Sequence, residues 1–152
     1  MASRFGEAAR KGLGAHSRAA AARREMEDVL RQASADLTDT LGVEVALLFD
    51  QLDRPAREQS TAEIIAGVPA PRVKVDALMA RLRSGSGRSV PLAEVEFGAL
   101  GYPVTVRYVH EWASAESKAS FEQVLVKLLE DPATGEALAK LVPNAEATSA
   151  PA

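Results

Sequence analysis

Residues 93–112 read AEVEFGALGYPVTVRYVHEW and carry the clearest β-strand pattern in the chain. In 93–99 the apolar and small residues alternate with Glu94 and Glu96, and a similar alternation runs through 102–112. The short gap around Leu100 and Gly101 fits a tight hairpin turn. Two neighbouring strands of this kind predict an antiparallel sheet with one face toward the core and one toward water.

The parity of the second strand decides which of its side chains point inward. Val104, Val106, Tyr108, His110 and Trp112 fall on one face if the strand is unbroken. A histidine among apolar neighbours can be a proton-transfer group, and more often it is a core residue or lies where a strand end opens to water. We therefore expect no catalytic role for His110.

A third strand is predicted over residues 43–49, with Val43, Val45, Leu47 and Phe49 on one face. The other face, 44, 46 and 48, is only partly polar, so this strand is either covered on both sides or central in the sheet. If Ala46 and Leu48 are exposed, that face becomes the first candidate for a docking site.

Helical spacing dominates the remaining segments. Apolar residues three and four apart predict a long helix over 18–41, with Ser17 as its N-cap and Gly42 ending it. Ser60 starts a short helix through a capping box, and the spacing in 75–82 indicates a second one. A helix beginning after Ser114 or Ser117 ends at Asp131-Pro132, with further helical turns over 134–141.

These elements predict an α+β fold: a small antiparallel sheet of about three strands packed against helices, with a long N-terminal helix. The chain of 152 residues suits a single domain, which we assign to 17–142. Residues 1–16 contain three glycines and are predicted to be a flexible basic arm or a broken helix. The alanine-rich residues 143–152 are predicted to be a disordered tail.

Composition excludes several chemistries. The chain has no cysteine, which removes disulfides, thiolate nucleophiles and cysteine-ligated metals. No apolar run approaches the roughly 20 residues needed to span a bilayer, and no secretory signal is evident, so a cytoplasmic protein without membrane contact is expected. No cofactor is indicated.

Three candidate sites lack the residues that their chemistry requires. His110-Glu111 has serine where a zincin motif needs a second histidine, and His16 is distant in the sequence. Asp50 and Asp53 follow a strand, as magnesium ligands often do, but neighbouring arginines indicate a solvated turn with ion pairs. The glycine-rich loop 84–89 has no lysine for a phosphate loop. We therefore expect neither a metal site nor an enzyme.

Charge is distributed unevenly along the chain. The net charge is −3, yet residues 1–24 carry six cations and one carboxylate, giving +5 there and −8 in the remainder. The cations are candidate phosphate or partner contacts: Arg4, Arg10, Lys11, Arg18, Arg23 and Arg24. An equally plain interpretation is a solubilising terminus.

The long helix offers a second candidate surface, because its apolar stripe can pack on the sheet or pair with the same helix of another copy. The stripe residues for such a helix-mediated interface are Met26, Val29, Leu30, Ala33 and Leu37. The leading expectation is a non-enzymatic interaction or assembly protein, a homo-oligomer or a subunit of a larger complex of the phage or mobile-element type. The alternative is a nucleic-acid-associated regulator whose basic arm contacts phosphates.

Overall fold

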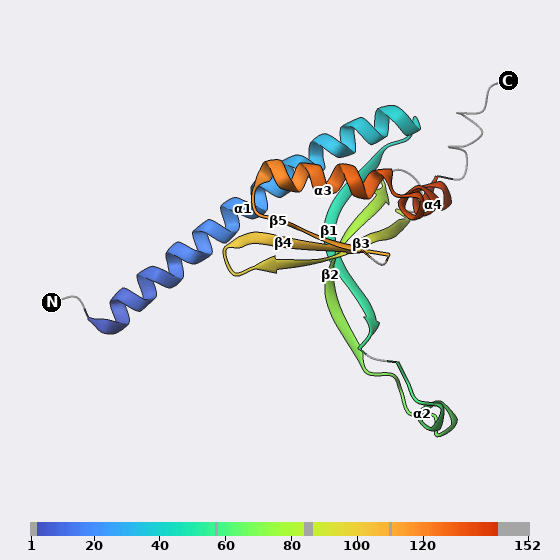
Figure 1. Cartoon of the computed structure of the whole chain (residues 1–152), viewed down its shortest axis with the longest axis horizontal. Helices are drawn as coiled ribbons and strands as arrows, with labels where there is room; N and C mark the ends of the chain where they lie inside the picture. The colour runs from blue at the N-terminus through green and yellow to red at the C-terminus, as the bar shows by residue number, and fades with distance from the viewer. Residues whose placement is uncertain (1–2, 57, 84–86, 110, 143–152) are drawn as a thin grey trace.

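The computed structural model describes residues 3–56, 58–83, 87–109 and 111–142. The chain forms an α+β fold in which a five-stranded antiparallel sheet, in the order β1-β2-β3-β4-β5, is covered by helices on one face (Figure 1). In chain order the elements are α1 (Arg4–Leu41), β1 (Val45–Pro55), α2 (Thr61–Ile65), β2 (Arg72–Leu82), β3 (Ser89–Gly98), β4 (Gly101–Tyr108), β5 (Glu111–Ala115), α3 (Lys118–Glu130) and α4 (Pro132–Leu141).

The predicted α+β class is confirmed, but the sheet has two more strands than expected. Residues 72–82 form β2, and the predicted helix over 75–82 is wrong. In this strand Leu78 belongs to the main core while Met79 lies on the opposite sheet face, and both are buried. A strand that is apolar on both faces has no alternation, so its apolar residues matched helical spacing by chance.

The second missed strand follows from a break after Tyr108. Val109 has a φ of 54°, and the chain then returns as β5. Tyr108 pairs with Glu111 and Arg107 pairs with Trp112. Trp112 therefore lies on the outer face beside Arg107, while Tyr108 is buried, which corrects the inward placement predicted for Trp112. His110 lies outside the described residues.

Helix α1 begins at Arg4, so the predicted N-cap at Ser17 and the predicted break at the glycines are wrong. Ser3 is the N-cap, and its hydroxyl accepts a hydrogen bond from the Gly6 N–H at 3.0 Å. Each interior glycine costs about 1 kcal/mol relative to alanine, and the alanine, arginine and lysine residues between them offset this. At the other end Gly42, with a φ of 73°, ends the helix as predicted. The flexibility expected of residues 1–16 stays a prediction.

The core lies between the sheet and the helices α1, α3 and α4. The cap of α3 is Ser117, one of the two predicted alternatives. The apolar side chains that α3 buries are Phe121, Val124, Leu125 and Leu128. The largest fully buried side chains come from both layers: Phe121, Met26, Leu78, Leu128, Leu141, Val45, Val104 and Val106.

Helix α1 also covers the edge of the sheet. β1 is an edge strand, and its Val45 and Leu47 N–H groups donate to the hydroxyls of Thr38 and Ser34 at 3.2 and 2.8 Å. The Ser34 hydroxyl in turn donates to the Leu30 carbonyl at 2.6 Å. Two small polar residues of the helix thus satisfy backbone groups that an edge strand leaves without a ladder partner.

Among the described residues no helix is long and apolar enough to cross a membrane. The predicted tail, 143–152, and residues 84–86 of the predicted loop 84–89 lie outside the described residues.

Candidate interaction surfaces

The first 18 residues of α1 project from the body of the domain (Figure 1). No residue of 4–21 is buried, and the first buried position of the helix is Ala22. We call residues 4–21 the α1 arm. Two large apolar side chains on it are solvent-exposed, Phe5 at 85% and Leu13 at 67%. The arm therefore has helical structure without a core of its own.

The body contacts α1 closely where the arm ends. Gly101, at the start of β4, has a φ of +88°, and a Cβ added there would overlap the Cβ of Ala22. One residue on, the Tyr102 hydroxyl donates to Glu25 Oε2 at 2.9 Å. Burial, followed by this contact with Glu25, raises the pKa of Tyr102 to about 12. These contacts fix the direction in which the arm leaves the body.

Of the six predicted cationic contacts, Arg23 is held within the domain. Its guanidinium lies 4.7 Å from the ring centre of Phe49 and 4.2 Å from that of Phe97. These are cation–π distances, and Glu27 lies 3.7 Å away on the next turn. Arg23 is therefore a structural residue at the junction, unlike the exposed Arg24.

The four remaining cations lie on the arm and are exposed: Arg4, Arg10, Lys11 and Arg18. At 100° per residue, Arg4, Lys11 and Arg18 fall within about 40° of one another, because they are seven residues apart. Arg10 lies on another side. Phe5, Ala9 and Leu13, four residues apart, form an apolar stripe roughly opposite the three aligned cations.

The residues of the predicted helix-mediated interface fall into two groups, one buried in the core and one partly exposed. Met26, Val29 and Leu30 are buried in the core of their own chain, so this part of the stripe caps the sheet within one molecule. Ala33 and Leu37 are only partly buried against that core.

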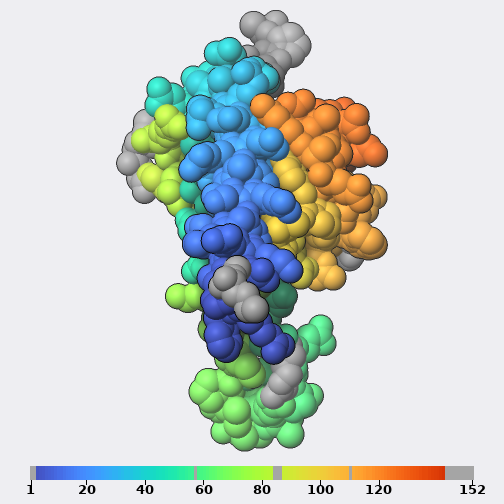
Figure 2. All heavy atoms as spheres, turned by 90° about the vertical axis from the view of Figure 1, so that its left-hand side faces the viewer, coloured from blue at the N-terminus to red at the C-terminus, as the bar shows by residue number. Residues whose placement is uncertain are grey.

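Between α1 and α3 lies a groove of about 340 Å³, which we call the α1–α3 groove. Figure 2 shows α3, in orange, beside the body half of α1, in light blue. Val126 of α3 lines the groove and is 54% exposed. The lining is apolar along both helices with a polar margin: Val29, Gln32, Ala33, Asp36, Leu37, Thr40, Glu122, Leu125, Val126 and Leu129.

The second projection is the far half of the β1–β2 hairpin (Figures 1 and 2). β3 pairs with β2 only from Ala77 to Arg81, so the hairpin beyond Ala77 is a two-stranded ribbon. Helix α2 closes it, and the predicted N-cap at Ser60 is confirmed, its hydroxyl accepting from the Glu63 N–H. Ile64 and Ile65 on α2 are exposed, Ile65 at 82%. We call residues 58–70 the hairpin tip.

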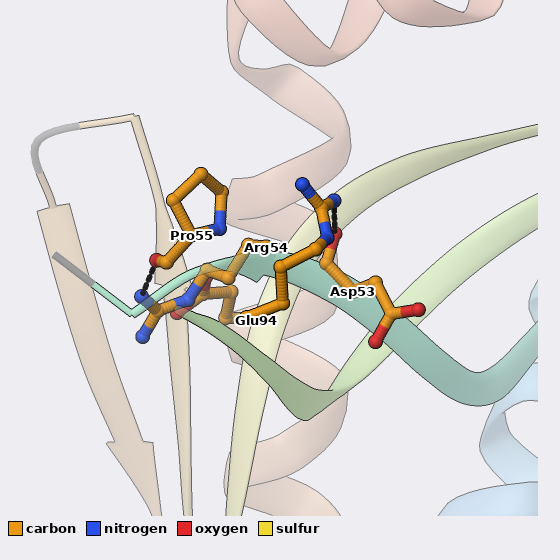
Figure 3. A network of polar contacts seen from close by, with 5 residues as sticks. Asp53, Arg54, Pro55 and Glu94 are labelled. Atoms are coloured by element: carbon orange, nitrogen blue, oxygen red, sulfur yellow. Dashed lines mark hydrogen bonds and ion pairs between the residues drawn. The ribbon is translucent and has the colours of Figure 1, made fainter. Parts of the chain in front are cut away.

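The sheet face opposite the helices is polar at its centre. Arg54 reaches from β1 to Glu94 of β3, with Nε and Oε1 2.6 Å apart (Figure 3). Arg107 pairs in register with Glu94 across β3 and β4. Trp112, 68% exposed, lies beside Arg107 at the rim of a hollow of about 540 Å³. Ala46 and Leu48 are half-buried, so the exposure that would have made them the first docking candidate is absent.

The remaining candidates from the sequence, Asp50, Asp53 and His16, do not form a site together. Asp50 pairs with Arg81 at 2.8 Å. Asp53 is three residues further along the same strand and so lies on the opposite face of the sheet. His16 is exposed on the arm. Within the described ranges, no group of three or more His, Cys, Asp or Glu side chains is placed to hold a metal ion.

Sequence reasoning missed the hairpin tip and the groove. Ile64 and Ile65 were assigned to a short helix, and only the ribbon that carries α2 away from the body makes them an exposed apolar end. The groove joins α1 with α3, far apart in the chain, so no local signal could reveal it.

No protein-family model matches this chain, and neither curated proteins nor solved structures include a match to it.

Proposed function

We propose that this protein is a non-enzymatic assembly protein that forms homo-oligomers, as a subunit of a larger complex, through segments projecting from its α+β body. One observation carries the proposal: both projections, the α1 arm and the hairpin tip, end in large exposed apolar side chains. Short helices without tertiary contacts are only marginally stable in water, and most helical stability in proteins comes from packing. A partner surface on the arm would supply that packing.

The charge distribution supports self-association. A basic projection on an acidic body gives each copy two surfaces of opposite sign, which attract one another across molecules. Contacts of this kind steer encounter and fix register, while the buried apolar residues supply the affinity.

The test is light scattering coupled to size exclusion over a wide range of protein concentrations. The expected result is a mass above the 16.1 kDa of one chain. Replacing Phe5 and Leu13 with serine, or Ile64 and Ile65 with serine, lowers this mass. A matched control is Leu100→Ser, which changes an exposed apolar residue in the β3–β4 turn. A mass of one chain at every concentration overturns the proposal.

A second candidate function is binding to nucleic acid through the arm. The alignment of Arg4, Lys11 and Arg18 on one exposed side of the helix favours it. Three neutralised phosphates on a DNA duplex give a slope of about −3 in a plot of log affinity against log salt concentration. Fluorescence anisotropy with a labelled duplex measures this slope, and replacing the three cations with serine removes it. Binding that is absent at low salt excludes this function.

A further inference from the structure

We propose that the α1 arm of one copy docks in the α1–α3 groove of a second copy, so that copies associate head to tail. This inference rests on the self-association proposed above and names the two surfaces that make the contact.

The arm cannot fill the groove of its own chain. The arm and one wall of the groove belong to the same continuous helix, and residues 5 and 33 are separated by about 42 Å along its axis at 1.5 Å per residue. An arm that binds this groove must therefore come from another molecule.

The two surfaces match in length and polarity. Phe5, Ala9 and Leu13 form one stripe, about 12 Å from the first to the last residue. The α1 wall of the groove runs from Val29 to Thr40, about 16 Å. An amphipathic helix that lays an apolar stripe into a groove between helices is a recurring mode of protein recognition.

The charges are complementary. The charged residues that line the groove are two carboxylates, Asp36 and Glu122, and no cation is among its lining residues. The arm has a net positive charge, with four cations and Glu7. Arg10 lies on the flank of the apolar stripe, where its long side chain reaches the margin of the groove. We assign Arg10 as the arm cation that faces Asp36 and Glu122.

Two single variants disable the two halves of the contact separately. Leu13→Asp places a charge on the arm stripe, and Val126→Asp places one in the groove. Both positions are well exposed, so both variants keep the fold, which circular dichroism verifies. Each variant raises the dissociation constant at least tenfold in analytical ultracentrifugation, while the control Leu100→Asp leaves it unchanged.

Mixing the two variants is the decisive experiment. The Leu13→Asp chain keeps a working groove and the Val126→Asp chain keeps a working arm, so the mixture forms a heterodimer that stops at two copies. Each variant alone remains monomeric at the same concentration. A symmetric contact, in which both copies use the same patch, gives no such complementation.

Charge exchange tests the assigned pair. Arg10→Glu weakens association, and Arg10→Glu combined with Glu122→Arg restores it, because each copy supplies both an arm and a groove. The control Arg24→Glu, on α1 beyond the arm, has no effect.

The outcomes separate this inference from the proposed function. If the parent chain is monomeric at every concentration, both fail. If it is oligomeric and neither Leu13→Asp nor Val126→Asp alters its dissociation constant, docking in the groove is wrong and self-association stands. Dissociation caused by Ile64→Asp and not by Leu13→Asp assigns the contact to the hairpin tip and overturns the arm as occupant.

Discussion

The two halves of α1 have the same secondary structure and different physical support. From Ala22 to Leu41 the helix contributes Met26, Val29 and Leu30 to the core and covers the β1 edge. From Arg4 to Ala21 it has no buried residue. The comparison shows that a continuous helix is not stabilised evenly along its length: the body half is held by burial, while the arm depends mainly on helix propensity and the Ser3 cap.

The largest expected effect is on the free energy of unfolding, when one apolar residue from each half of α1 is replaced with alanine. Met26→Ala removes a fully buried side chain and lowers the free energy of unfolding by about 2–5 kcal/mol. Leu13→Ala changes an exposed residue, and we expect a change within about 0.5 kcal/mol for the monomer. Urea unfolding below the concentration of self-association measures both. Equal effects would mean that the arm is packed within its own chain.

Replacing either of two glycines with alanine is expected to have an effect of intermediate size, destabilising at Gly101 and stabilising at Gly12. Gly101→Ala forces a Cβ against Ala22 at a left-handed backbone position, and we expect a loss of about 1–3 kcal/mol. Gly12→Ala lies in the arm with nothing within 4 Å of the added Cβ, so it stabilises the helix by up to about 1 kcal/mol.

Thermal unfolding measures the effect of Gly101→Ala, and the far-ultraviolet helical signal measures that of Gly12→Ala. A neutral Gly101→Ala would show that β4 does not hold the helix at this junction.

The smallest expected effect is a pH dependence where the two halves meet. The pKa of Tyr102 is raised from 10.0 to about 12, so the folded state keeps the phenol proton longer than the unfolded chain does. The associated stability is present below pH 10.0 and is lost as the pH rises toward about 12. Tyr102→Phe abolishes this part of the alkaline loss.

Absorbance titration of tyrosinate in parent and variant checks the assignment, since the chain has only one other tyrosine, Tyr108. A Tyr102 transition at the ordinary pH would contradict both the burial of the phenol and its contact with Glu25.

Local signals in the sequence predicted much of this fold. The β3–β4 hairpin, the caps at Ser60 and Ser117 and the end of α1 at Gly42 each depend on residues a few positions apart, and each is confirmed. β2 could not be predicted in this way, because its two apolar faces depend on neighbours distant in the chain. Trp112 was assigned to the wrong face because one residue, Val109, breaks the alternation.

The candidate surfaces were predicted less well than the fold. The sequence indicated a basic N-terminal segment. It did not indicate that one of its cations, Arg23, makes cation–π contacts with Phe49 and Phe97 inside the domain. It also indicated an apolar stripe on α1, and burial in the core of the same chain removed most of it from the exposed surface. Exposure is a property of the assembled layers, so pattern alone could not separate the residues that stabilise the monomer from those available to a partner.

The hydroxyls of Ser34 and Thr38 have a consequence for aggregation. An open edge strand is a template onto which another chain can add, and such addition leads to amyloid-like stacking. Because these two side chains occupy the outward N–H groups of Val45 and Leu47, strand addition at this end of β1 requires that α1 first detach. The helix that carries the arm outward thus also protects this end of the sheet edge, and a chain without Ser34 and Thr38 would leave these two N–H groups open to another strand.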